Sequence, residues 1–458
     1  MVLLINSPLF LEGTCFDTED SLPPIGLGLI ATYLQKNNVH VELLDALYQK
    51  ISVVELKKIL SRLSPDFIGI NIFTTNYDIV KDLIESIDFH THIIIGSLST
   101  KNLYSKIVAW KSVNQIDVVI GDGELITLDI VNGNIKIDPM VVDKNRRVFK
   151  IDQFSQYFVS DISKVELSRR FFPNEPNINQ FGALEANIVT SRGCSNNCTF
   201  CAASRSMNMD YPIRERSESS IIYELKQISA EYAKIESVRI LDDLFLKSSK
   251  SIEKAVSIFS NFDLQWRSMA HVKTFNQVDR TTIRSLRECG CKELFIGIES
   301  GSTRILREMN KTSDRGLIIR NLTKLFEARI NIKGYFIYGF PGESEPDMRC
   351  TYELAQELKE LAIKYKSSFR TSVFQFRPYH GSEIFSILEK KYNMDSLHSI
   401  PNRSLTAKIG RGQFNFQSGN FTDVCLETLH DYICRTNELN GSKVYSKRNQ
   451  RVIYSKQG

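Results

Sequence analysis

Residues 190–201 read Thr190-Ser-Arg-Gly-Cys194-Ser-Asn-Asn-Cys198-Thr-Phe-Cys201, and this stretch decides the fold. Its three cysteines are spaced C-x₃-C-x₂-C and directly follow a predicted strand at 187–190. Iron–sulfur clusters are held by Cys thiolates, and a tight loop after Gly193 can bring each thiolate to a different iron. In a [4Fe–4S] cluster one iron would then stay open for a cofactor or substrate. The motif predicts a cluster on Cys194, Cys198 and Cys201.

A structural zinc site is the alternative for this loop. Zinc prefers four ligands, usually arranged as two separated pairs. No fourth Cys or His lies near the motif in the sequence, and the seven histidines are scattered. The spacing therefore favours the iron–sulfur cluster.

The motif opens a series in which strand-like and helix-like segments alternate. Strands are predicted at 187–190, 237–241, 265–269, 293–298, 332–338 and 372–376, and helices at 217–233, 251–262, 279–288, 315–328 and 345–365. A complete (β/α)₈ barrel typically takes about 250 residues, more than are available here. The series predicts an open, six-stranded partial (β/α)₆ barrel.

The cysteine loop after the first barrel strand, with Phe200 before the last cysteine, resembles the cluster motif of the radical S-adenosylmethionine (SAM) superfamily. Ser195 stands where many members have Pro. The resemblance implies that SAM binds the open iron through its amino and carboxylate groups. It also implies that reductive cleavage gives a 5′-deoxyadenosyl radical, which abstracts hydrogen from the substrate.

Later segments follow the order of that superfamily, each at the predicted carboxyl end of a strand, where barrel active sites are built. The resemblance implies SAM-binding roles for Asp242, Asp243, Glu299, Ser300, Gly301, Gly339, Pro341 and Gly342. The acids can take the SAM ammonium or ribose hydroxyls, and the glycines allow close backbone approach. For any single segment a turn or a helix cap is the alternative, since residues 301–303 could simply start a helix.

The first 125 residues also alternate, which predicts a doubly wound parallel sheet that binds ligands beyond the carboxyl ends of its strands. Strands are predicted at 2–5, 39–44, 67–72, 93–95 and 118–120, and helices at 26–35, 53–63 and 77–87. The segments 3–6, 23–27, 41–45 and 121–124 resemble the cobalamin-binding domain of one large radical SAM subgroup.

The resemblance implies a set of cobalamin contacts at these strand ends: Asn6, Pro24, Gly26, Thr74, Thr75, Ser97, Gly121, Gly123 and Glu124. The motif that supplies a cobalt-ligating His in other cobalamin enzymes is absent. His90 and His92 lie just before a strand and are expected to be surface residues, so cobalt is expected without a His ligand from the protein. A degenerate domain that keeps the fold without the cofactor is the alternative.

The sequence thus predicts four parts: a cobalamin-binding-like domain at 1–125, a connecting segment at 126–185, the partial barrel at 186–385, and a C-terminal cap with a basic tail at 386–458. The connecting segment contains weak strands at 134–137 and 147–151, and the cap one helix around 423–437. The tail from Ser442 is expected to be a solvated terminus. Cys289, Cys291, Cys350, Cys425 and Cys434 are expected to be small buried packing residues.

The composition argues against several classes of protein. The net charge of +5 indicates no large nucleic-acid surface, and no apolar run approaches the ~20 residues that span a bilayer. The start at Met1 lacks the basic region of a signal peptide. An odd number of cysteines, nine, argues against a disulfide framework. We therefore expect a cytoplasmic protein.

Together these features predict a cobalamin-dependent radical SAM enzyme that methylates an unactivated carbon of a small-molecule or peptide substrate, supplied with electrons by a donor such as flavodoxin or ferredoxin. Three alternatives stay open. They are radical rearrangement, cyclisation or oxidation on the same scaffold; methylthio transfer, although the further cluster cysteines of that group are missing; and a non-catalytic iron–sulfur sensor. The sequence identifies no catalytic base and no substrate contact.

Overall fold

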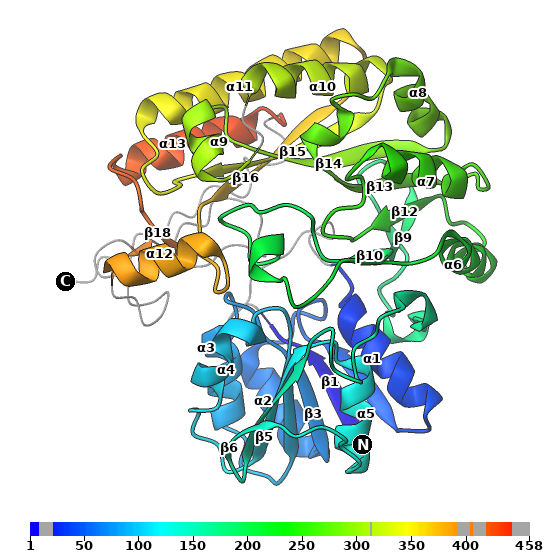
Figure 1. Cartoon of the computed structure of the whole chain (residues 1–458), viewed down its shortest axis with the longest axis vertical. Coiled ribbons are helices and arrows are strands. Elements are labelled where there is room, and N and C mark those ends of the chain that lie inside the picture. Colours follow the sequence, from blue (N-terminus) through cyan, green and yellow to red (C-terminus); the bar gives the residue numbers. More distant parts are fainter. Residues whose placement is uncertain (9–21, 312–313, 393–403, 406–417, 442–458) are drawn as a thin grey trace. The chain divides into compact units, whose positions relative to one another are not determined.

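A computed structural model describes residues 1–8, 22–311, 314–392, 404–405 and 418–441. The chain forms two compact units (Figure 1). The N-terminal unit contains Met1–Asn177 and Ser206–Ser217, and the barrel unit contains Ile178–Arg205 and Glu218–Gly458. The chain therefore passes between the units three times.

The N-terminal unit is built on a seven-stranded sheet with the order β2-β1-β3-β4-β5-β7-β6. Strands β1 to β5 and β7 run parallel, and β6 pairs antiparallel with β7. Its elements are β1 (Val2–Asn6), α1 (Ile25–Lys36), β2 (Val41–Asp45), α2 (Val53–Leu63), β3 (Phe67–Asn71), α3 (Tyr77–Glu85), β4 (His92–Gly96), α4 (Thr100–Ile107), β5 (Gln115–Gly121), α5 (Glu124–Asn132), β6 (Met140–Asp143) and β7 (Arg146–Ile151). The predicted doubly wound fold is confirmed. Its strand order reverses beside β1, and at such a point the strand ends leave room for a ligand.

The sheet is apolar on both faces, which explains why its strands read as continuous hydrophobic runs. One face packs Leu3, Ile5, Ile68 and Ile70 with α2, α3 and α4. The other packs Ile94, Val119 and Phe149 with α5. Helix α2 begins at a capping box in which Ser52 and Glu55 exchange hydrogen bonds.

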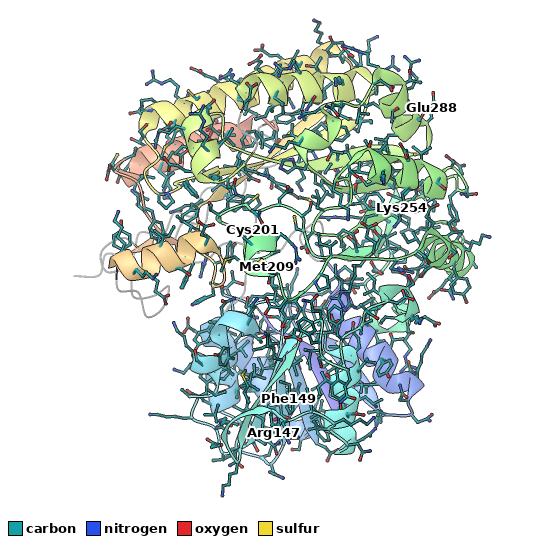
Figure 2. The ribbon with its side chains drawn as sticks, viewed as in Figure 1. Arg147, Phe149, Cys201, Met209, Lys254 and Glu288 are labelled. Atoms are coloured by element: carbon teal, nitrogen blue, oxygen red, sulfur yellow. The ribbon has the colours of Figure 1, made fainter. Side chains whose placement is uncertain are left out.

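Three expectations for this unit need correction. The weak strand expected at 134–137 is instead β6, which starts at Met140. Helices α4 and α5 were not predicted. His92 was expected at the surface, but it begins β4 and its Nε2 lies 2.8 Å from Oδ2 of the buried Asp117. Arg147 binds the same carboxylate and stacks on Phe149, 5.3 Å from the ring centroid (Figure 2). This cluster lies away from the carboxyl ends of the strands.

The barrel unit is built on a second seven-stranded sheet, with the order β16-β15-β14-β13-β12-β9-β8. The six predicted strands run parallel, and the short β8 adds a seventh at one edge. Its strands are β8 (Asn177–Ile178), β9 (Leu184–Ile188), β12 (Ser237–Ile240), β13 (Gln265–Ala270), β14 (Cys291–Glu299), β15 (Asn331–Tyr338) and β16 (Phe369–Gln375); its helices are α6 (Glu218–Glu231), α7 (Ser249–Phe259), α8 (Arg280–Glu288), α9 (Thr303–Glu308), α10 (Arg315–Glu327), α11 (Glu345–Lys364), α12 (Glu383–Tyr392) and α13 (Leu426–Glu438). Short strands outside these sheets are β10 (Ser191–Arg192), β11 (Arg214–Glu215), β17 (Ser404–Leu405) and β18 (Ser418–Gly419). The partial-barrel prediction is confirmed.

The two faces of the barrel sheet differ in polarity. Side chains alternate between the faces along a strand. Ile188, Val238, Leu294, Ile332 and Phe336 belong to the apolar core together with the covering helices. The alternate positions form what we call the inner face: Arg239, Arg267, Glu293, Phe295, Lys333, Tyr335 and Arg370.

Helix α13 contributes Leu429, Tyr432 and Ile433 to the same core, so the C-terminal cap is a packed part of the barrel unit. The tail from Ser442, expected to be solvated, lies outside the described residues. No helix in the described parts of the chain is long and apolar enough to cross a membrane.

The remaining cysteines divide into two groups. Cys289 and Cys291 are buried in the core, as expected. Cys350 and Cys434 are half-buried, and Cys425 is exposed because it precedes the first turn of α13 at the protein surface. Cys350 and Cys434 are thus less buried than expected, and the prediction of a buried Cys425 was wrong.

Candidate functional site

The cysteine loop lies directly after β9, at the carboxyl edge of the barrel sheet. Neighbouring segments fix its backbone: Thr199 donates from N to the Met309 carbonyl at 3.1 Å, and Asn310 donates from Nδ2 to the Asn197 carbonyl at 2.8 Å. Thr199 also accepts from the backbone N of Ile384 at 3.0 Å. The loop is therefore held from two sides, by the segment after α9 and by the start of α12.

All three cysteines of the loop are free thiols, Cys198 buried and the other two half-buried. Desolvation raises the pKa of each, to about 12 for Cys201. The thiols also raise one another's pKa, because two neighbouring thiolates repel. Three thiolates become stable here when metal cations stand among them, which is the condition that an iron–sulfur cluster meets.

No three His, Cys, Asp or Glu side chains in the described part of the chain converge on one point where a single metal ion could bind. Three thiolates around a four-iron cluster each bind a different iron, so they do not need to converge. The donor set fits the cluster.

Two adjacent acids follow β12, and the structure separates their roles. Asp242 is buried and accepts hydrogen bonds from Thr190 N at 2.6 Å, Thr190 Oγ1 at 2.5 Å and Ser191 Oγ at 2.7 Å. It therefore fastens the strand end from which the cysteine loop begins. Asp243 reaches solvent and acts electrostatically on Cys194 and Cys201, while desolvation, followed by Asp242, raises its pKa. Of the two acids, Asp243 is therefore the one accessible to a ligand from solvent.

Glu299 ends β14 and forms a buried ion pair with Lys311, Nζ to Oε1 at 3.1 Å. Desolvation raises the pKa of Glu299. Desolvation alone would lower the pKa of Lys311, but Glu299 and Cys198 outweigh it and the Lys311 pKa is raised. A Cβ on Gly297 would stand 2.2 Å from Glu299 Oε1 and 2.8 Å from Lys311 Nζ, so only glycine leaves room for this pair.

Sequence reasoning missed Lys311. Lys311 lies three residues after α9 and not at a predicted strand end. Its burial results from tertiary packing, which the local sequence does not reveal. Glu299 and Lys311 both act electrostatically on Cys198. That combination can bind a ligand bearing an ammonium and a carboxylate of its own.

Residues 300–302, which follow Glu299, make most of their contacts with α9 and α11. Ser300 Oγ lies 2.9 Å from Thr351 Oγ1, which also accepts from Gly301 N at 2.9 Å. A Cβ on Gly301 would stand 2.1 Å from the Cys350 carbonyl oxygen. Ser302 caps α9. The structure places Ser300 and Gly301 in a helix contact.

The turn at 339–343, which follows β15, is stabilised by a hydrogen bond to the carboxylate of its own Glu343. Gly339, at φ +87°, donates from N to Glu343 Oε2 at 2.6 Å. Pro341 is half-buried, and Gly342, at φ +75°, is exposed with open space where a Cβ would stand. Glu343 Oε1 is buried without a hydrogen-bond partner among the described residues, and desolvation raises the Glu343 pKa to about 8. The sequence analysis assigned no role to Glu343.

His271, also missed from the sequence, directly follows β13 at the same edge. Its Nδ1 accepts from Lys273 N at 3.1 Å, which leaves Nε2 as the protonated nitrogen of a neutral ring. Desolvation, together with Lys311 and Lys273, lowers the His271 pKa to about 3. The ring is a neutral N–H donor at physiological pH.

In the N-terminal unit, a polar chain joins the carboxyl ends of three neighbouring strands. Asn6 donates from Nδ2 to Asp45 Oδ1 and accepts from Asn71 Nδ2, both at 2.7 Å. Asn71 Oδ1 accepts from Ser7 N at 3.0 Å. Asp45 is buried, desolvation raises its pKa, and its Oδ2 has no hydrogen-bond partner among the described residues. Asn6 was predicted; Asp45 and Asn71 were not singled out as site residues, although both end strands.

The other predicted cobalamin contacts at this edge fall into two groups. The first group is at least partly accessible. Pro24, at the start of α1, and Thr75 are half-buried, and Gly26 is exposed with nothing within 4 Å of where a Cβ would stand. Thr74 is buried in the turn after β3. Ser97 hydrogen-bonds the Ile72 carbonyl and accepts from Ser99 N at 3.0 Å, so it braces the loop after β4.

The second group has closely packed neighbours, although Gly121 is exposed and Gly123 half-buried. A Cβ on Gly121, which has φ +109°, would stand 2.3 Å from the Ile151 carbonyl oxygen, and one on Gly123 would stand 2.8 Å from Ile30. Glu124 is buried at the first turn of α5. Neighbouring residues therefore leave little space for a side chain at this end of β5.

Residues 206–217 of the same unit, which we call the strap, lie across the end of β5. Tyr211 donates from its hydroxyl to the Ile120 carbonyl at 3.3 Å. Arg214 pairs with Asp122, donates to the Val159 carbonyl at 2.6 Å and stacks on Phe158, 4.2 Å from the ring centroid. Lys101 donates to the Met207 carbonyl at 2.8 Å.

Comparison with known proteins identifies both units. The model of the radical SAM superfamily matches residues 188–355. The chain carries a radical SAM domain. The model of the B12-binding domain matches residues 15–131. Both resemblances predicted from the sequence are therefore confirmed.

Curated relatives match most of the chain. An uncharacterized methyltransferase of Pyrococcus horikoshii is 26% identical over 377 residues, covering 79% of this chain and 78% of the relative. The cytidylyl-2-hydroxyethylphosphonate methyltransferase of Streptomyces wedmorensis is 24% identical over 450 residues, covering 84% and 80%. Both combine low identity with coverage that extends beyond the radical SAM domain.

Solved structures share the fold. The radical SAM methyltransferase TsrM from Kitasatospora setae, solved with tryptophan substrate and a SAM analog, has a TM-score of 0.65 at 15% identity, covering 96% of this chain and 88% of that one. The cobalamin-dependent SAM radical enzyme OxsB, solved with aqua-cobalamin and SAM, has a TM-score of 0.59 at 16% identity and covers 92% of this chain. This chain spans 64% of the length of OxsB.

Proposed function

We propose that the protein is a cobalamin-dependent radical SAM methyltransferase that transfers a methyl group to an unactivated carbon of a small-molecule or peptide substrate. The observation that carries the proposal is the pairing of a B12-binding domain with a radical SAM domain that places three free thiols at its strand ends. Relatives over most of the chain are named methyltransferases, which supports methyl transfer over the other radical reactions.

In the radical SAM domain, Cys194, Cys198 and Cys201 would hold a [4Fe–4S] cluster. Asp243, Glu299 and Lys311 would bind the polar groups of SAM, since they lie within electrostatic reach of the thiols. Asp242 would position the loop. When bound, the cluster and SAM supply the radical that activates the acceptor carbon, and cobalamin supplies the methyl group.

In the B12-binding domain, the carboxyl edge of the sheet would take the corrin. Asn6, Asp45 and Asn71 provide a connected set of amide and carboxyl groups there, and a buried Asp45 oxygen is open to a further donor. Gly26 leaves space above α1. In this proposal no histidine of the protein binds cobalt.

The proposal also includes an external electron donor of the flavodoxin or ferredoxin class, because reductive cleavage of SAM consumes one electron. We place the protein in the cytoplasm and expect no nucleic-acid partner, consistent with its mild net charge.

The test is anaerobic reconstitution of the full chain. We expect about four irons per chain, 5′-deoxyadenosine on reduction with SAM, and saturable binding of hydroxocobalamin. Replacing Cys194, Cys198 and Cys201 together by Ala should remove the iron and the SAM cleavage. Cys425→Ala, which changes an exposed thiol, is the matched control and should retain both.

The outcomes separate the alternatives. Full iron in the triple variant would refute the cluster assignment. SAM cleavage without cobalamin binding would favour rearrangement, cyclisation or oxidation on the same scaffold. A bound cluster without SAM cleavage would leave the sensor.

A further inference from the structure

We propose that three phenylalanine rings, Phe340, Phe376 and Phe421, exclude water from one side of the cysteine loop and so hold the bound iron–sulfur cluster at a low reduction potential. We call these rings the aromatic shield. The inference rests on the proposed function and deepens it, since it names residues that set the redox behaviour of that same site. Phe421, from the C-terminal cap, is a positioning residue in it.

The two residues between Cys198 and Cys201 are fixed in different ways. Thr199 is held by hydrogen bonds, among them one from its N to the Met309 carbonyl at 3.1 Å. Phe200 is held by packing, because its side chain lies against an apolar group of buried residues that includes Met309 and the whole aromatic shield. Phe200 is bonded directly to Cys201, so the packing of its ring constrains the position of that thiol.

The rings of the aromatic shield meet edge to face. Phe376 lies 5.2 Å from Phe340 at an interplanar angle of 74°, and 5.4 Å from Phe421 at 86°, centroid to centroid. Such T-shaped pairs are a preferred arrangement of aromatic side chains. All three residues are buried, and even Phe421 is only 5% exposed. The three rings therefore pack as one unit.

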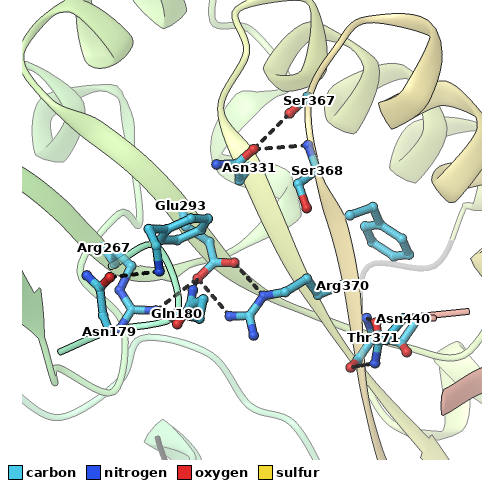
Figure 3. A network of polar contacts seen from close by, with 12 residues as sticks. Asn179, Gln180, Arg267, Glu293, Asn331, Ser367, Ser368, Arg370, Thr371 and Asn440 are labelled. Atoms are coloured by element: carbon cyan, nitrogen blue, oxygen red, sulfur yellow. Dashed lines mark hydrogen bonds and ion pairs between the residues drawn. The ribbon is translucent and has the colours of Figure 1, made fainter. Parts of the chain in front are cut away.

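The rings come from three separate segments of the barrel unit. The first two follow β15 and β16, at the carboxyl edge of the sheet where the cysteine loop lies. Phe421 precedes α13, and its carbonyl accepts from Gly342 N at 3.3 Å. Just beyond α13, Asn440 exchanges hydrogen bonds with the backbone of Thr371 in β16, at 2.7 and 2.9 Å (Figure 3). The C-terminal cap is thus fastened to the sheet and supplies the third ring.

A second observation places the segment after β16 close to the thiols. Desolvation raises the pKa of Tyr379, three residues after Phe376, and Cys201 adds to that effect while Arg377 opposes it. The surroundings of Tyr379 are therefore poor in water and within electrostatic reach of Cys201. This agrees with an apolar, closed side of the cysteine loop.

Apolar surroundings lower the reduction potential of such a cluster. One-electron reduction adds a negative charge to the cluster, and that charge is less stable where water is excluded. Burial and solvent exposure are among the factors that set cluster potentials. A strongly reducing cluster suits the proposed reaction, because reductive cleavage of SAM consumes one electron. The external donor then has to be a correspondingly strong reductant.

The experiment is a redox titration of the anaerobically reconstituted full chain without SAM, followed by electron paramagnetic resonance of the reduced cluster. Phe421→Ala should move the midpoint potential in the positive direction. It should also deepen the deuterium modulation of the spin echo in D₂O, because water enters the space of the ring. Phe421→Leu, which keeps most of the apolar volume, should stay close to the parent. Ile387→Ala, which truncates an exposed side chain on α12, is the matched control and should change neither quantity.

A Phe421→Ala variant with parental iron content and an unchanged midpoint potential would overturn the proposal, as would an equal shift in Phe421→Leu or Ile387→Ala. Where Phe421→Ala does not fold, Phe421→Val removes less of the side chain and should shift the potential in the same direction; a parental potential in that variant overturns the proposal. The iron content of the parent is measured separately. A parent without a cluster refutes the proposed function, whereas a cluster that is insensitive to these substitutions refutes only the aromatic shield.

Discussion

At the scale of single residues, the two adjacent acids after β12 have different surroundings. Asp242 and Asp243 are adjacent and chemically alike. Only the structure shows that Asp242 accepts hydrogen bonds from Thr190 and Ser191, while Asp243 reaches solvent. Glu299 was predicted, yet its partner Lys311 was not, because nothing in a sequence marks which lysine is buried. The structure also shows that Gly301 packs closely against α11.

The Glu299–Lys311 pair gives a first prediction. Glu299→Gln should lower the free energy of unfolding by about 3–5 kcal/mol, because it leaves a buried ammonium without its carboxylate. Adding Lys311→Met should restore part of that stability but not SAM binding, which we expect to be about tenfold or more weaker. Denaturant unfolding and equilibrium SAM binding check the two effects.

Glu308→Gln, at a more exposed carboxylate on α9, is the control for this pair and should change neither quantity. Parent-like SAM affinity in the double variant would show that the ion pair is structural only.

A second prediction concerns Glu343. Its pKa is raised to about 8 in the folded state, so between its ordinary value and pH 8 the folded chain holds a proton that the unfolded chain has lost. Stability from this group is thus fully present at low pH and falls as pH rises toward 8. Glu343→Gln, which mimics the protonated acid, should flatten the decline and gain on the order of a few kcal/mol at pH 8 relative to pH 5.

Unfolding curves at several pH values check this expectation, with Glu345→Gln, at the first residue of α11, as the control. A variant with the same pH slope as the parent would mean that Glu343 titrates normally.

At the scale of elements, helices with long amphipathic patterns and clear caps were predicted closely. Helix α2 was expected at the bounds it has, and the structure adds a capping box of Ser52 and Glu55. The missed helices are short or atypical: α9 has six residues, α4 has no capping hydrogen bond from a side chain, and α5 begins with a buried glutamate. Such segments become helical because the parallel sheet needs a crossover at that place, and this tertiary requirement is weakly visible in local sequence.

Helix α1 contains a matched pair of glycines that yields a third prediction. A Cβ on Gly26 would meet nothing within 4 Å, whereas one on Gly28 would stand 2.2 Å from the ring of Phe172. Gly26→Ala should therefore stabilise the B12-binding domain by about 0.5–1 kcal/mol through helix propensity. Gly28→Ala should destabilise it by about 1–3 kcal/mol through overpacking.

Hydroxocobalamin titration of both variants separates packing from binding. If the corrin approaches the start of α1, Gly26→Ala will bind it more weakly despite its higher stability. Unchanged affinity would remove Gly26 from the cobalamin surface.

At the scale of the whole molecule, the strap gives a fourth prediction. Arg214 lies far from β5 in sequence, yet it pairs with the buried Asp122 and stacks on Phe158. Arg214→Ala leaves that carboxylate without its guanidinium and should destabilise the N-terminal unit by about 3–5 kcal/mol. Hydrogen exchange should show the loss at the end of β5, with protection of the barrel core unchanged.

Arg216→Ala, two residues further along the strap, serves as the comparison. Equal effects of the two substitutions on exchange at the end of β5 would argue against a specific role of the Arg214 pair.

The strap also bears on how such a protein can evolve. Residues 206–217 belong to the N-terminal unit but are encoded inside the stretch that specifies the barrel, immediately after the cysteine motif. A single genetic crossover near residue 177 would replace β1 to β7 and leave the old strap to meet a foreign sheet. Module shuffling at this junction is therefore disfavoured, and the two units are expected to be inherited together.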